Sequence, residues 1–393
     1  MLSVTTEFNM QLDGVRVIDL SRIISGPFCT MLLADFGADV VKVEPPGGDP
    51  VRQQGAIIEG MSWYFASFNR NKRSIELDLR SLQGLETLRA LLRDADVLVE
   101  NFRPGVMDQM GLGWDALQAL SPGIIHTSIN GFGTTGPYAK RPAFDFITQA
   151  MSGFMTMNGT SSTGPMRTAV PISDLIAGNY AALGTVAALY RRKTTGQGEQ
   201  VSTSLLSSMI SLGSFVSANY LASGEQMPPT GNDHPLVAPY GLFTASDGDI
   251  AVAPSNDGVL RRLFQALGLI HLIDDSRFSS NASRVSRRAE INSLINEVVC
   301  TQPRSHWIAV LNEAGVPCGT VMNLDEVYRD PQVLHQEMVL EVEHPGRGTV
   351  RMTGFPIKFR NEPCEIRHHA PDLGDNTEEI LEELASKLAA TGP

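Results

Sequence analysis

The chain has 393 residues, 42% of them hydrophobic, and a formal net charge of −12. This length allows two or three domains with a sizeable core, while the acidic balance argues against general nucleic-acid binding, which requires a basic surface. Residues 1–10 lack the basic start and apolar core of a signal peptide. The cysteines include no closely spaced pair, so we expect buried, reduced thiols of a cytoplasmic protein. They are Cys29, Cys300, Cys318 and Cys364.

Short β-branched runs alternate with helical patterns through the first part of the chain. Each run ends in polar residues and is followed by a loop that contains Gly or Pro. This alternation predicts an α/β fold with a mostly parallel sheet. The predicted strands are 15–20, 38–44, 96–101 and 123–129, and the helical patterns between them are 26–36 and 81–94.

Ligands of such sheets bind outside the carboxyl ends of the strands. The segments expected at that edge are 21–25, 45–49, 101–105 and 130–136.

The composition changes near Ser223, where a polar, proline-rich segment over 224–240 begins. A strand-like run over 249–253 and several helical patterns follow it. We therefore predict three parts: the N-terminal part of a large domain over 1–223, a small domain over 224–323, and a C-terminal part over 324–393 that returns to the large domain.

Asp174 stands just ahead of an apolar, helix-like run over 175–190. It could cap that helix by accepting backbone N–H bonds. Alternatively, it could face a cavity as a nucleophile held by the same N–H groups. These residues alone favour the cap, because Asp is a preferred cap residue. The apolar stretch 172–190 contains Asp174 and Asn179, so we do not expect it to span a membrane.

Residues 131–136 match the pattern GxGxxG, but Pro137 follows them and no apolar helix opens there. A loop that covers some ligand other than a dinucleotide is favoured, since glycine lets the backbone approach closely.

Arg70, Lys72 and Arg73 place three cations within four residues of an acidic chain. Such a run is usually a solvated face, although arginine also suits a phosphate cradle. The sequence contains no recognisable metal-site or serine-nucleophile pattern. Any covalent chemistry therefore falls to a carboxylate or a lone thiol.

Taken together, seven short segments resemble the class III CoA-transferase family of the CaiB/BaiF type, which includes formyl-CoA:oxalate CoA-transferase and α-methylacyl-CoA racemase. The resemblance runs over nearly the whole chain, and it depends on the order of the segments more than on any one of them. The segments are 12–19, Gly26-Pro27, 37–44, 71–75, 100–105, 131–133 and the Ser173-Asp174 step.

The resemblance implies a fold and an assembly. The expected fold is α/β: a large Rossmann-like domain, with a parallel sheet built from both chain ends, plus a smaller α+β domain. The expected assembly is an interlocked homodimer. No permanently bound cofactor or metal is implied, because coenzyme A (CoA) is a substrate. The expected partners are an acyl-CoA and a small carboxylic acid, with neither nucleic acid nor membrane.

The resemblance also implies site residues. Asp174 is the expected nucleophile. Cations of the resembled transferases fall on Pro45 and Gln109 here, which leaves Arg52, Arg103 or Arg141 as alternative phosphate partners. Arg167, His234 and Tyr240 are candidates to meet the acceptor acid, although each is equally well a structural loop residue. The implied CoA contacts are Ile23, Ser25, Leu77, Arg80, Asn101 and Phe102.

The predicted reaction moves CoA from an acyl-CoA donor to a small carboxylic acid through an aspartyl-acyl anhydride and an aspartyl-CoA thioester. It requires an ionised Asp174, so we expect backbone donors at the helix start to keep the pKa of this group from rising. It also requires exclusion of water. The loops 131–136 and 231–235 are the lid candidates, with plain surface loops as the alternative.

Two other functions remain open at this point. One is an acyl-CoA racemase or epimerase, which needs a general base on each side of the α-carbon. It is disfavoured because Phe144 stands where the racemase branch places its catalytic histidine. The other is a CoA-binding protein without chemistry, against which the presence of Asp174 in the motif weighs.

Overall fold

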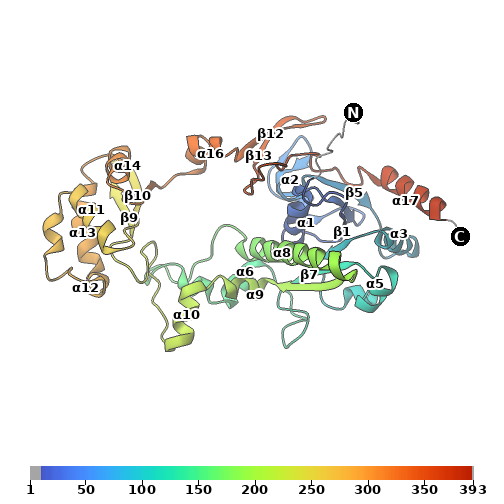
Figure 1. The fold of residues 1–393 in the computed structure, drawn as a ribbon, viewed down its shortest axis with the longest axis horizontal. Helices are drawn as coiled ribbons and strands as arrows, with labels where there is room; N and C mark the ends of the chain where they lie inside the picture. The colour runs from blue at the N-terminus through green and yellow to red at the C-terminus, as the bar shows by residue number, and fades with distance from the viewer. Residues whose placement is uncertain (1–9, 392–393) are drawn as a thin grey trace, which may run out of the picture. The chain divides into compact units, whose positions relative to one another are not determined.

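The computed structural model describes residues 10–391 (Figure 1). The chain divides into two compact units. The larger unit comprises the chain up to Ser152, Thr168–Ser214 and the chain from Gln332 onward. The smaller unit comprises Gly153–Arg167 and Phe215–Pro331. Each unit has a hydrophobic core of its own.

Among the described residues of the larger unit, six parallel strands form one sheet in the order β5-β2-β1-β6-β7-β8. The strand order reverses between β1 and β6, and in such folds ligands bind at this switch point. The strands are β1 Arg16–Asp19, β2 Asp39–Glu44, β5 Lys72–Glu76, β6 Val97–Glu100, β7 Ile125–Asn130 and β8 Glu199–Ser204.

All of these strands come from the N-terminal part of the chain, so the prediction of a sheet built from both chain ends is wrong. The returning C-terminal segment instead adds helix α17 (Thr377–Thr391), which packs on β5. It also adds a two-stranded hairpin of β12 (Val339–His344) and β13 (Gly348–Thr353).

Alternate residues of the strands face opposite sides of the sheet, as the pleat requires. Val17 and Val40 pack with α1 (Ser25–Asp35) and α8 (Ile172–Thr195) on one face. Their neighbours Ile18 and Val41 pack on the other face with side chains of α3 (Leu82–Arg93), α5 (Trp114–Leu120) and α17. Burial on both faces explains the continuous apolar runs in the sequence.

Helix α8 is long and apolar enough to cross a bilayer by length and composition alone. In this structure it packs against α1, α9 (Leu205–Ser211), β7 and β8. These contacts are those of a core helix, and Figure 1 shows α8 running alongside α1 and over β7.

The smaller unit contains a three-stranded antiparallel sheet, β11-β10-β9. Its core includes Phe243, Ile250, Phe264 and Ile291. The strands are β9 Gly241–Ala245, β10 Gly248–Val252 and β11 Cys318–Thr320, and the helices are α11 Asp257–Ala266, α12 Asn281–Ser286, α13 Arg288–Val299 and α14 Arg304–Glu313, with a short 3-10 helix at Ile270–Ile273.

The connections carry shorter elements. These are a 3-10 helix at Pro50–Gln53, β3 Ile57–Ile58, β4 Met61–Ser62, α2 Trp63–Asn69, α4 Val106–Gln109, α6 Asp145–Met151, α7 Phe154–Met157, α10 Ser214–Ser223, α15 Leu324–Val327 and α16 Pro331–His335.

The cysteines are free thiols in the described chain. Cys29 is buried, but Cys300 is exposed, and Cys318 and Cys364 are half-buried. The expectation of buried thiols therefore holds for Cys29 alone.

Candidate active site

The loops after β1 and β6 meet at the switch point of the larger sheet. Asn101 accepts a hydrogen bond from the backbone N–H of Arg22 at 2.9 Å and donates one to the carbonyl of Arg22 at 2.7 Å. The same amide nitrogen of Asn101 lies 3.5 Å from the hydroxyl of Ser25. The guanidinium of Arg22 lies over the ring of Phe102, 5.6 Å from its centroid. Three of the predicted CoA contacts are thus brought together: Ser25, Asn101 and Phe102.

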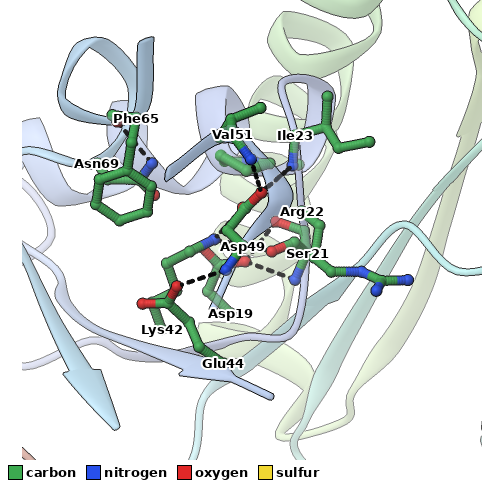
Figure 2. A network of polar contacts seen from close by, with 12 residues as sticks. Asp19, Ser21, Arg22, Ile23, Lys42, Glu44, Asp49, Val51, Phe65 and Asn69 are labelled. Carbon is green, nitrogen blue, oxygen red and sulfur yellow. Dashed lines mark hydrogen bonds and ion pairs between the residues drawn. The ribbon is translucent and has the colours of Figure 1, made fainter. Parts of the chain in front are cut away.

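Ile23 lies between these contacts with a backbone φ of +73°. A β-branched residue is rare in this left-handed region. Its N–H points at the carboxylate of Asp49, at 3.1 and 3.2 Å from the two oxygens (Figure 2). The sequence placed Asp49 within the segment 45–49 expected at the ligand-binding edge, but it did not single out this residue.

Asp174 is the third residue of α8, whose N-cap is Pro171. The cap interpretation, which the local residues alone favoured, is therefore wrong, because Asp174 lies inside the first turn. The reason for its closeness to Ser25 is Gly178, one turn further on. A Cβ at Gly178 would lie 2.7 Å from the carbonyl oxygen of Ser25. Only glycine lets α8 approach α1 this closely.

Asp145, the first residue of α6, accepts hydrogen bonds from Ser173 at the start of α8. One oxygen of Asp145 accepts from both the backbone N–H and the hydroxyl of Ser173, each at 2.9 Å. Its second oxygen accepts from the side-chain amide of Gln149 at 2.7 Å. The Ser173 hydroxyl in turn accepts from Thr148 at 2.9 Å. Asp145 therefore stabilises the end of α8 from a neighbouring helix.

The pKa of Asp174 is raised from 3.8 to about 7, first by burial and then by the negative charge of Asp145, while a hydrogen bond from Ser25 lowers it. The prediction that backbone donors would keep this pKa from rising is wrong, because the N–H of Ser173 donates to Asp145 instead. Tyr64 lies close by: burial raises the pKa of its phenol, and the charge of Asp174 raises it further. A half-buried carboxyl with a perturbed pKa in such a setting is typical of a functional group.

The cation run of Arg70, Lys72 and Arg73 forms neither a solvated face nor a phosphate cradle, so both interpretations are wrong. Arg70 pairs with Asp35 at 2.8 Å and Lys72 with Asp19 at 3.1 Å. Arg73 binds Asp39 at 2.8 Å and two glutamates of α17, Glu379 and Glu383. All three cations are committed to ion pairs that tie the sheet to its surroundings.

The other candidate phosphate partners differ in their availability. Arg52 makes a two-pronged contact with Glu44, at 2.6 and 2.8 Å, and stacks 3.6 Å from the centroid of Phe65, which disfavours it. Arg80 and Arg103 are exposed in the loops after β5 and β6. Arg141 is also exposed and lies over the ring of Tyr138. Leu77, the remaining predicted contact, directly follows β5 and is 9% exposed.

The glycine-rich loop over 131–136 follows β7. Gly133 and Gly136 have positive φ angles, as such a turn needs. The next helix of the described chain, α6, begins only at Asp145, so the strand-loop-helix geometry of a dinucleotide site is not formed here.

The predicted acceptor contacts Arg167, His234 and Tyr240 belong to the smaller unit. The His234 ring stacks on Phe215 at 5.6 Å and lies 4.9 Å from the ring of Tyr240. Its Nδ1 accepts from the N–H of Leu236 at 3.1 Å. Burial, followed by the charge of Arg288, lowers the pKa of His234, which keeps the ring neutral. Arg167 is exposed at the end of the 153–167 segment.

Among residues 10–391, no group of three or more His, Cys, Asp or Glu side chains is arranged to hold a metal ion. The site thus contains the carboxyl group of Asp174, the hydroxyl of Ser25 and the side-chain amide of Asn101. Such a set can attack a carbonyl and bind a polar chain, which is the chemistry of acyl transfer.

Comparisons with known proteins agree with this geometry. A family model described as CoA-transferase family III matches residues 12–377. The chain is 36% identical to the succinyl-CoA:glutarate CoA-transferase of Homo sapiens, over 95% of this chain and 86% of that protein. It is 35% identical to the acetyl-CoA:oxalate CoA-transferase of Acetobacter aceti, over 96% of each. A crystal structure of a CaiB/BaiF family protein from Brucella suis superposes with a TM-score of 0.86 at 37% identity, over 96% of this chain and 100% of that one. The chain therefore belongs to CoA-transferase family III and is an acyl-CoA:carboxylate CoA-transferase.

Proposed function

We propose that the enzyme transfers CoA from a short acyl-CoA to a small dicarboxylic acid, with Asp174 as the nucleophile. The observation that carries this proposal is the position of Asp174, in the first turn of α8 and hydrogen-bonded to Ser25 beside the switch point. The relatives named above support the substrate class, because glutarate and oxalate are both dicarboxylates.

In the first half-reaction a carboxylate oxygen of Asp174 attacks the thioester carbonyl carbon, the carbon–sulfur bond breaks, and CoA leaves as a thiolate. This forms an aspartyl-acyl anhydride. The thiolate then attacks the aspartyl carbonyl and releases the donor acid as a carboxylate, which leaves an aspartyl-CoA thioester. Each intermediate remains activated, so the energy of the thioester is retained.

In the second half-reaction the acceptor carboxylate attacks the aspartyl carbonyl and displaces the thiolate again. The thiolate attacks the acceptor's acyl carbon in the new anhydride. A new acyl-CoA forms, and Asp174 leaves as a carboxylate. Every step is an attack on a carbonyl, and the protein has only to align the groups and exclude water. We propose that the loop 131–136 excludes water by closing over the site.

The raised pKa of Asp174 has two consequences for this chemistry. A carboxylate of higher pKa is a stronger nucleophile, but it must first lose its proton. The hydrogen bond from Ser25 favours the charged form, which is the form that attacks. We therefore assign Ser25 the task of keeping Asp174 partly ionised near neutral pH.

For CoA, we assign the pantetheine arm to the loops of Ser25 and Asn101, and the phosphates to the exposed Arg80 and Arg103. For the acceptor, we assign His234, Tyr240 and Arg167. Since Nδ1 of His234 already accepts a backbone bond, only its Nε2–H remains to donate to an acceptor carboxylate.

We also propose that the enzyme is a homodimer. The outer face of α8 exposes a stripe of large apolar side chains: Tyr180 is 42% exposed, Leu183 67% and Tyr190 76%. Apolar side chains that gather on one face of a helix mark an interaction surface. An interlocked pair of subunits, as the family resemblance implies, would cover this stripe.

The proposed function is tested by a panel of donors and acceptors. Succinyl-CoA and acetyl-CoA are each incubated with glutarate, oxalate, mesaconate and citramalate, and the products are followed by mass spectrometry. We expect transfer to at least one dicarboxylate and an acyl or CoA adduct on the Asp174 peptide after quenching. Substantial turnover by Asp174→Ala would rule out Asp174 as the nucleophile.

A further inference from the structure

A buried group of ion pairs lies beneath the loop over residues 21–25 (Figure 2). Lys42 and Asp49 are both fully buried and pair at 3.1 Å. The ammonium group of Lys42 also donates to the carbonyl of Ser21 at 2.9 Å. Asp19, itself paired with Lys72, accepts from the backbone N–H of Ser21 at 2.9 Å. Charged side chains therefore bind both backbone groups of Ser21: Asp19 accepts from its N–H, and Lys42 donates to its carbonyl.

The same group controls the conformation of Ile23. The N–H of Ile23 donates to Asp49, and one oxygen of Asp49 also accepts from Val51 at 3.2 Å. Glu44 completes the support by accepting from the backbone N–H of Asp49 at 3.0 Å. Strained φ angles in β-branched residues persist only where the surroundings impose them, and they gather at functional sites. Here the imposed bond is the one from Ile23 to Asp49.

The backbone conformation of Ile23 determines how Arg22 and Ser25, on either side of it, are placed relative to each other. Arg22, on one side of it, is held by Asn101, and Ser25, two residues further on, begins α1 and donates to Asp174. If Ile23 relaxed to negative φ, the chain direction between these two residues would change. The backbone at the switch point and the Ser25 hydroxyl could then no longer both keep their places.

We propose that Asp49, anchored by Lys42, is a positioning residue that holds Ile23 in its left-handed conformation and thereby shapes the loop over 21–25 for CoA. This inference rests on the proposed placement of CoA beside Ser25 and Asn101. Asp49 itself need not touch the substrate, since its carboxylate is already engaged by Lys42, Ile23 and Val51.

The test is a double-mutant cycle read by calorimetric titration with coenzyme A alone. The four proteins are the wild type, Asp49→Ala, Ile23→Gly and the double variant. Glycine adopts a φ of +73° without steric cost, so it removes the need for Asp49. We expect Asp49→Ala to weaken CoA binding by roughly tenfold to a hundredfold in the wild-type background, the affinity equivalent of such strain. In the Ile23→Gly background, Asp49→Ala should weaken CoA binding by about threefold or less.

Equal losses of affinity in the two backgrounds would overturn the proposal, because Asp49 would then act independently of Ile23. If Asp49→Ala does not fold, Asp49→Asn provides the same cycle, since its amide oxygen keeps an acceptor for Ile23 while the pair with Lys42 is lost. We expect Asp49→Asn to lose less CoA affinity than is expected for Asp49→Ala, and we expect Ile23→Gly to abolish this loss again.

The control is the buried ion pair of Asp35 with Arg70, which also lies in the larger unit but at the opposite end of α1. We expect Asp35→Asn to lower the thermal midpoint while leaving CoA affinity within about twofold of the wild type. An equal loss of CoA affinity in this variant would show that Asp49 acts only through general stability.

The test is separate from that of the nucleophile. Asp174→Asn should bind coenzyme A but not turn over, whereas Asp49→Ala should bind it weakly. Weak binding in Asp49→Ala together with full turnover in Asp174→Asn would refute the proposed nucleophile and leave the role of Asp49 intact.

Discussion

Asp145 and Asp174 compete for the donors at the start of α8, and Asp145 obtains them. The carboxylate of Asp145 accepts from the N–H and hydroxyl of Ser173, each at 2.9 Å. Asp174, which follows Ser173 in the chain, instead accepts a hydrogen bond from the Ser25 hydroxyl. The helix end is thus stabilised by one carboxylate, and the other is left with a pKa of about 7. This division separates a structural acid, Asp145, from the proposed nucleophile, Asp174.

The first prediction concerns the pH profile. Asp145→Asn removes the like charge next to Asp174, so the pKa of Asp174 should fall toward its ordinary value. The acidic limb of kcat/KM, which we expect near pH 7 in the wild type, should move to lower pH. Stopped assays from pH 5 to 9 measure this.

The matched control is Asp115→Asn, an exposed acid in the first turn of α5. Its acidic limb should coincide with that of the wild type. An unchanged limb in Asp145→Asn would mean that the limb reports a group other than Asp174.

The second prediction concerns stability. Because the pKa of Asp174 is about 7 in the folded state and 3.8 is the ordinary value of an aspartate, the folded protein binds this proton more tightly than the unfolded chain between those pH values. Stability contributed by the protonated group is therefore present below pH 3.8 and lost as pH rises through 7. Asp174→Asn does not lose this stability, because the amide of asparagine does not ionise. Relative to the wild type, the variant should gain roughly 1 to 4 kcal/mol between pH 4 and pH 8.

Thermal unfolding of both proteins across this pH range measures the difference. A constant offset between the two curves would contradict a raised pKa, and a difference that shrinks with rising pH would reverse its sign. The exposed Asp115→Asn variant should run parallel to the wild type throughout.

The sequence predicted the parts of the fold that depend on local pattern. The strands β1, β2, β6 and β7 and the helices α1 and α3 lie within one or two residues of their expected bounds, because each is an apolar run of the right period. Two strands of the six-stranded sheet were missed. β5 reads Lys-Arg-Ser-Ile-Glu and β8 reads Glu-Gln-Val-Ser-Thr-Ser, and such polar sequences give no strand signal.

For the candidate site, the sequence pointed to individual residues but not to the contacts that surround them. The family resemblance pointed to Asp174, Ser25 and Asn101, but the chemistry of their neighbours depends on contacts made by distant segments. Lys72 finds its partner Asp19 across 53 residues of sequence, so the cation run could not be distinguished from a phosphate site. The pKa of Asp174 was misjudged for the same reason, since no local pattern shows which carboxylate receives the N–H of Ser173.

The third prediction concerns the contact between α1 and α8. A methyl group at Gly178 would meet the backbone oxygen of Ser25 at 2.7 Å, so one helix must move. Gly178→Ala should destabilise the protein by about 1 to 3 kcal/mol and reduce turnover, because Ser25 moves away from Asp174. Thermal unfolding and kcat measure the two effects.

Gly184→Ala is the control on the same helix. There the added methyl meets only a terminal methyl of Val201, which can rotate away, and alanine favours the helix. We expect stability within about 1 kcal/mol of the wild type and normal turnover. Equal defects in both variants would argue that any glycine replacement in α8 is harmful.

The fourth prediction separates the phosphate partners from the structural cations. Arg103→Gln removes an exposed guanidinium from the loop after β6 and should weaken CoA binding roughly tenfold. Arg73→Gln breaks the ion pairs with Asp39 and Glu383, and should lower the thermal midpoint without changing CoA affinity. Titration with coenzyme A, compared with dephospho-CoA, would show which phosphate is lost. Weakened binding in Arg73→Gln alone would restore the phosphate interpretation of the cation run.

The fifth prediction concerns assembly. If the apolar stripe of α8 is covered by a second subunit, Leu183→Glu places a charge in a dry interface, which is costly without a partner. Light scattering after size-exclusion chromatography should then show a dimer for the wild type and monomer or aggregate for the variant. Leu82→Glu is the control, because Leu82 is 81% exposed on α3 and outside the stripe, and it should remain dimeric. A Leu183→Glu variant that stays dimeric with an unchanged thermal midpoint would place the subunit interface on another surface.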